Sequence, residues 1–126
     1  MLFLVMGNSL TGHVILIVEP GIDQFVIKLQ TALERRGAET LAAREPARAI
    51  DRMRQFRFSA GILNYDDASA SLHELIDELS GIPVLLYGGE RACVDSGRKV
   101  PHLAFADARV ESIVSALGRL LEPVRH

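Results

Sequence analysis

The sequence lacks the features that would mark a disulfide-rich, membrane-spanning or polyanion-binding protein. It has a single cysteine, Cys93, which excludes an internal disulfide and fits a reducing cytoplasm. Its formal net charge is only −2 over 126 residues, so no overall field favours nucleic acid or an anionic membrane. The apolar start, residues 1–6, is too short for a membrane span or a signal core. We therefore expect a cytoplasmic globular protein without a nucleic-acid or membrane partner.

Small and polar residues dominate residues 7–12, directly after this apolar start, and indicate a flexible segment. The remaining length suits one domain with a sizeable core, because 48% of the residues are hydrophobic and 24% are charged. We expect a flexible N-terminal tail over residues 1–12, a single domain over 13–122 and a C-terminal tail over 123–126.

The hydrophobic pattern alternates between short apolar runs and stretches with helical periodicity. Residues 13–18 form a continuous β-branched run, which is typical of a strand buried on both faces. Asp23 and Asp107 are expected to cap the first and last helices, and Phe56 to lie on the apolar face of the second helix. In chain order, the expected strands are residues 13–18, 39–43, 58–64, 82–87 and 101–105, and the expected helices span about 23–36, 46–56, 71–80 and 107–121.

This alternation predicts an α/β domain, in which helices cover both faces of a parallel sheet. Residues 88–100 interrupt the pattern because they are polar, contain three glycines and show little apolar periodicity. We expect a loop there, with at most a short helix.

The third expected strand stops at a polar side chain. The run that begins at Gly61 ends at Asn64, and two carboxylates follow at Asp66 and Asp67. In an open α/β sheet, the carboxyl ends of the strands face the crevice where ligands bind. A carboxylate at this strand end would indicate a phosphoryl acceptor or a metal ligand, whereas this chain has an amide.

Several segments, taken in order, resemble a response-regulator receiver domain. Residues 14–19 resemble the first strand of that family running into its acidic pocket, and residues 33–39 resemble the junction of its first helix and second strand. Residues 47–50 and 81–86 resemble its second helix and fourth strand. The resemblance implies a flavodoxin-like, doubly wound sheet of five parallel strands in the order 2-1-3-4-5. It also implies helices on both faces, with the fourth helix short or replaced by a loop, and a role in two-component or phosphorelay signalling.

The chemistry of that family needs paired acids that hold Mg²⁺, an aspartate that accepts the phosphoryl group, and a hydroxyl and a lysine that bind it. Carried over by position, these places are held here by Glu19 and Pro20, by Asn64, by Gly88 and by Phe105. An amide is a far weaker phosphoryl nucleophile than a carboxylate. The resemblance therefore implies a degenerate receiver, or pseudo-receiver, which is no enzyme, has no cofactor and acts by protein contact.

Alternative interpretations remain for the same crevice. Asp66 is a possible substitute acceptor, and Glu19 with Asp66 is a possible weak site for a divalent cation such as Mg²⁺. A flavodoxin-like protein or enzyme that binds a small ligand would use this crevice too, although the sequence offers it no acid–base pair and no phosphate loop.

The resemblance also implies partners. A histidine kinase or an output protein is expected to bind the domain, and strand five with the last helix forms a possible homodimer face. Arginines are dense around the second helix, where they form either a solvated helix face or a docking surface for an acidic partner. These residues are Arg44, Arg48, Arg52, Arg54 and Arg57.

Overall fold

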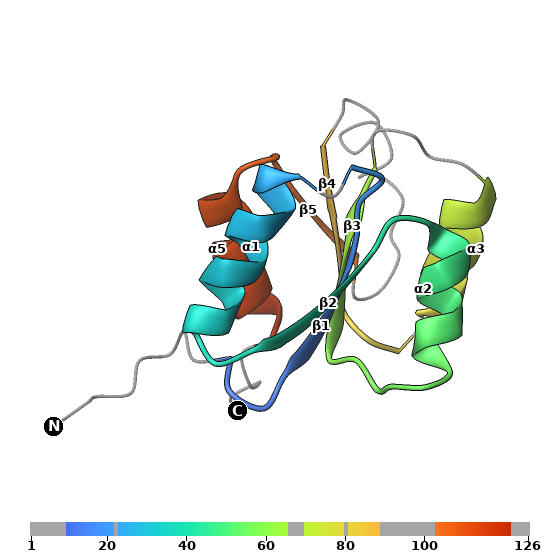
Figure 1. Ribbon diagram of the computed structural model, residues 1–126, viewed down its shortest axis with the longest axis horizontal. Helices are drawn as coiled ribbons and strands as arrows, with labels where there is room; N and C mark the ends of the chain where they lie inside the picture. Colours follow the sequence, from blue (N-terminus) through green and yellow to red (C-terminus); the bar gives the residue numbers. More distant parts are fainter. Residues whose placement is uncertain (1–9, 22, 66–69, 80, 89–102, 122–126) are drawn as a thin grey trace, which may run out of the picture.

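Five parallel strands form one sheet in the order β2-β1-β3-β4-β5. The computed structural model describes residues 10–21, 23–65, 70–79, 81–88 and 103–121 (Figure 1). The strand order confirms the fold class expected from the sequence, a flavodoxin-like doubly wound sheet. The strands are β1 Val14–Val18, β2 Glu39–Ala43, β3 Ala60–Asn64, β4 Val84–Tyr87 and β5 Leu103–Ala106.

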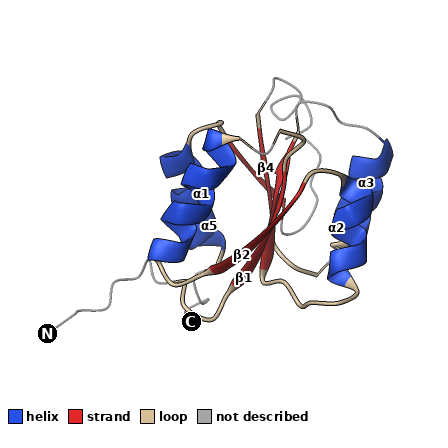
Figure 2. Ribbon diagram, viewed as in Figure 1, coloured by secondary structure: helices blue, strands red, loops and turns tan. Residues whose placement is uncertain are grey.

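Helices cover both faces of the sheet (Figure 2). Helices α1 (Gln24–Arg35) and α5 (Val110–Leu120) lie on one face, and α2 (Pro46–Met53) and α3 (Ala70–Glu78) lie on the other. The connection between β4 and β5, for which a loop or short helix was expected, lies largely outside the described residues. Within the described part of the chain, no helix is long and apolar enough to cross a membrane.

The central strands are apolar up to their carboxyl ends, and each of their two faces packs against helices. In β1, Ile15 and Ile17 belong to the core beneath α1 and α5, whereas Leu16 and Val18 belong to the core beneath α2 and α3. Continuous burial of this kind explains why the sequence shows runs rather than alternation in its strands.

Two local predictions differ from the structure. The second helix ends at Met53, because the amides of Arg54 and Gln55 bond to carbonyls only two or three residues back in the following turn. Phe56 is therefore 49% exposed rather than on a buried helix face.

The prediction of helix caps was right for Asp23 and wrong for Asp107. The side chain of Asp23 accepts a hydrogen bond from the Phe25 amide at 3.0 Å. Helix α5 instead begins after Arg109, which makes no side-chain cap bond, and Asp107 contributes only its backbone carbonyl to the Arg109 amide.

Leu10 packs into the hydrophobic core, although it belongs to the segment that was expected to be a tail. Leu10 is 2% exposed in the core beneath α1 and α5, and its amide donates to the Arg36 carbonyl at 2.8 Å. This contact brings Thr11 against Gly37, the residue after the C-cap of α1. Gly37 has a φ of +98°, and a Cβ there would lie 2.4 Å from Thr11 Oγ1 and 3.0 Å from Thr11 Cα.

Substitution of Gly37 should separate this contact from simple backbone strain. Gly81 has the same φ of +98° but no atom within 4 Å of an added Cβ, so it is a matched control. We expect Gly81→Ala to lower the free energy of unfolding by about 1 kcal/mol, the cost of a left-handed alanine. Gly37→Ala should cost about 1 kcal/mol more, as measured by chemical denaturation. Equal losses for the two variants would contradict the role of the Thr11 contact.

Candidate functional site at the carboxyl edge of the sheet

Three polar side chains from different strand ends meet at the carboxyl edge of the sheet. Glu19 directly follows β1, and its amide donates to the Ala43 carbonyl at the end of β2. Asn64 ends β3 and Tyr87 ends β4, and the parallel register places these two residues opposite each other. Because β1 and β3 are neighbours, the sheet topology brings Glu19 and Asn64 together.

The Glu19 carboxylate accepts hydrogen bonds on both of its oxygens. Asn64 Nδ2 donates to Oε1 at 2.8 Å, and the Tyr87 hydroxyl donates to the same oxygen at 2.5 Å. The Gly21 amide donates to Oε2 at 3.0 Å. A carboxylate can only accept, so this neighbour fixes the amide of Asn64 with its nitrogen towards Glu19. The acid is thus surrounded by donors of its own chain.

Packing places the Tyr87 hydroxyl. Tyr87 is 2% exposed, and its ring lies against Phe25 of α1 with the ring centroids 5.5 Å apart. Its carbonyl accepts the Tyr65 amide at 2.8 Å, which ties the end of β4 to the residue after β3. The hydroxyl therefore reaches Glu19 from a side chain held by the core.

Tyr87 is the member of this site that the sequence analysis missed. The family pattern directed attention to Gly88, one residue further on. The available signal was a phenol at the end of a buried strand, since a buried tyrosine needs a partner for its hydroxyl.

The other predicted positions do not join Glu19. Pro20 is exposed, and Gly88 follows Tyr87 with a φ of +86°. Ala106, rather than Phe105, stands in register with Tyr87. Phe105 packs on the opposite face of the sheet, with its ring centroid 6.5 Å from that of Tyr65. Asp66 lies outside the described residues.

The donor set at this edge does not fit Mg²⁺. Hard cations need several oxygen ligands, usually more than one carboxylate. Among the described residues that contact one another here, Glu19 is the carboxylate, its oxygens accept N–H and O–H donors, and the amide nitrogen of Asn64 points at it. Among the described residues, no group of three or more histidine, cysteine, aspartate or glutamate side chains is placed to hold a metal ion.

Removal of the Tyr87 hydroxyl tests the network. Tyr87→Phe keeps the ring against Phe25 but removes the donor to a charged acceptor, so we expect a loss of about 1–2 kcal/mol in unfolding free energy. In a Glu19→Ala background the same substitution should cost less, which gives a coupling energy of about 0.5 kcal/mol or more in a double-mutant cycle. The same loss in both backgrounds would mean that the hydroxyl does not act through Glu19.

Comparisons with known proteins identify the fold. No protein-family model matches the chain, and no curated protein matches it. A chemotaxis response regulator of Vibrio cholerae superposes with a TM-score of 0.72 at 17% identity, over 88% of this chain and 100% of that chain. A response regulator receiver protein from Sinorhizobium medicae gives 0.72 at 16% identity, over 90% and 97%. The signal receiver domain of a histidine kinase from Syntrophus aciditrophicus gives 0.70 at 25% identity, over 91% and 94%. The chain has the fold of response-regulator receiver domains.

Proposed function

We propose that this chain is a pseudo-receiver, a module of two-component or phosphorelay signalling that acts by protein contact and does not accept a phosphoryl group at the end of β3. The observation that carries the proposal is the Glu19 carboxylate, which accepts hydrogen bonds from Asn64, Tyr87 and Gly21. These donors of the chain itself compete for the oxygens that a metal would use.

The residue at the end of β3 also has the wrong chemistry for phosphoryl transfer. The Asn64 amide is uncharged and a poor nucleophile, and its nitrogen is committed to Glu19. Across the edge, Tyr87 and Ala106 follow in register, so this row of described residues carries no cation to neutralise a phosphoryl group. The hydrogen bonds to Glu19 hold the sheet edge in one conformation. A partner could recognise that conformation without a phosphorylation signal.

The partner that this role implies is a signalling protein, either a histidine kinase or an output protein. Helices cover both faces of the sheet, which supports recognition by the outer faces of the helices. A substitute acceptor at Asp66, or a small ligand in the crevice, would be a different function at the same edge.

Treatment with a small phosphodonor tests the proposal directly. The protein is incubated with acetyl phosphate and Mg²⁺ beside a phosphorylatable receiver as a positive control, and intact masses are measured by mass spectrometry. We expect the mass of this chain to stay unchanged while the control gains one phosphoryl group. A stable gain of one phosphoryl group on this chain would overturn the proposal. Loss of that gain in an Asp66→Ala variant would then assign the acceptor to Asp66.

A further inference from the structure

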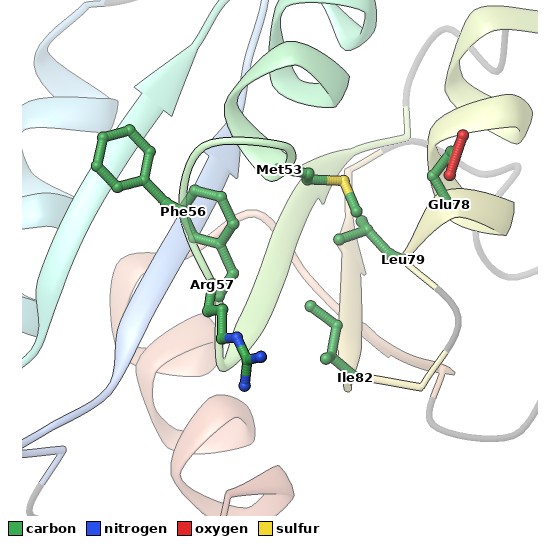
Figure 3. Close-up of a pocket in the computed structure, with 7 residues that line it drawn as sticks. Met53, Phe56, Arg57, Glu78, Leu79 and Ile82 are labelled. Carbon is green, nitrogen blue, oxygen red and sulfur yellow. The ribbon is translucent and has the colours of Figure 1, made fainter.

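An apolar hollow opens at the amino end of the sheet, away from Glu19. It encloses about 360 Å³ between the turn after α2 and the end of α3 (Figure 3). Phe56 and Arg57 lie on one side of it, and Glu78 and Leu79 lie on the other. Its lining residues are Met53, Phe56, Arg57, Phe58, Glu78, Leu79 and Ile82.

The hollow exposes an aromatic side chain that the fold does not need in order to fill its core. Phe56 is 49% exposed, and its ring lies 6.5 Å from that of Phe58, centroid to centroid. Met53 and Ile82 are only half-buried beside it. Aromatic residues at the centre of such patches commonly supply most of the binding energy of a protein interface.

The two sides of the hollow carry opposite charge. Residues 44–57, which include α2, hold five arginines against Glu45 and Asp51, a formal surplus of three positive charges in a chain whose net charge is −2. On α3, Glu74, Asp77 and Glu78 are all exposed, and the helix has no arginine or lysine.

The arginines around α2 and the acids of α3 lie on neighbouring helices. Helices α2 and α3 lie side by side on the same face of the sheet (Figures 1 and 2). Even so, within the described part of the chain, the five arginine side chains form no ion pair or hydrogen bond. The face thus has a positive half, an apolar centre and a negative half.

We propose that this face binds the same face of a second copy of the chain. A two-fold axis that runs between α2 and α3 would set α2 of each copy against α3 of the other. Phe56 of each copy would then face the Leu79 side of the partner's hollow. Opposite charges would then meet twice. A partner of one charge sign would instead place like charges against one half of the face, so the charge pattern favours a second copy over an acidic peptide.

The energetics of such a contact can be divided between its centre and its rim. Burial of Phe56 and the half-buried side chains around it would provide the affinity. The exposed arginines and acids would mainly fix the orientation, and their contribution would weaken with salt. This dimer face differs from strand five and the last helix, which the family resemblance suggested, and it does not depend on the absence of phosphorylation.

Two charge-reversed variants test the proposal. One carries Arg48→Glu, Arg52→Glu and Arg57→Glu, and the other carries Glu74→Lys, Asp77→Lys and Glu78→Lys. Sedimentation velocity at low salt should show wild-type dimers at high micromolar concentration, and each variant alone as a monomer because like charges oppose. The equimolar mixture should form a heterodimer, because both charged contacts are complementary again. Misfolding would not be repaired by mixing, and circular dichroism checks each variant alone.

Two further variants locate the contact. Phe56→Ala should weaken the wild-type dimer at least about tenfold with a small effect on stability, because the side chain is half exposed in the monomer. Arg119→Glu on α5, beside the second hollow near Phe105, should leave the dimer intact. The proposal is overturned if the wild type stays monomeric at every concentration, if the mixture does not associate, or if Arg119→Glu abolishes the dimer while the α2 and α3 variants keep it.

Discussion

A carboxylate at the edge of a sheet needs donors or a cation, and in this protein Glu19 takes its donors from its own chain. Asn64 and Tyr87 come from two neighbouring strands, and Gly21 comes from the turn that Glu19 begins. The same bonds join the ends of β1, β3 and β4, so they connect three central strands at the carboxyl edge of the sheet. The hydrogen bonds around Glu19 therefore form a structural joint between these strand ends.

The hydrogen bonds at this joint depend on the amide at position 64, where a carboxylate could not donate to Glu19. With an aspartate at position 64, two carboxylates would face each other, and a divalent cation would relieve their repulsion. The amide removes that repulsion by donating a hydrogen bond to Glu19, and the Tyr87 hydroxyl adds a second donor from a ring held by Phe25.

The sequence was sufficient for the features that depend on local pattern. Apolar runs such as residues 14–18 form strands whose two faces are both buried. The cap of helix α1 is equally local, because Asp23 accepts its hydrogen bond from an amide only two residues along the chain. Glu19 and Asn64 were assigned to the carboxyl edge of the sheet through the family resemblance, whereas their hydrogen bond is visible only in the structure. Phe105 shows where prediction from the sequence pattern fails. A difference of one residue in the register of a short strand moves a side chain to the other face of the sheet. Tyr87 was missed because the reach of its hydroxyl depends on packing against another element.

The most direct measurement of the central claim is a Mg²⁺ titration followed by nuclear magnetic resonance of the Asn64 side-chain amide, with Asn64→Asp as the comparison variant followed through its backbone amides. If hydrogen bonds from the chain satisfy Glu19, the wild-type signals should show no saturable change with Mg²⁺. The variant, which has two facing carboxylates and lacks the amide donor, should show saturable shifts around residues 19 and 64. Saturable Mg²⁺ binding at Glu19 and Asn64 in the wild-type protein would contradict the account.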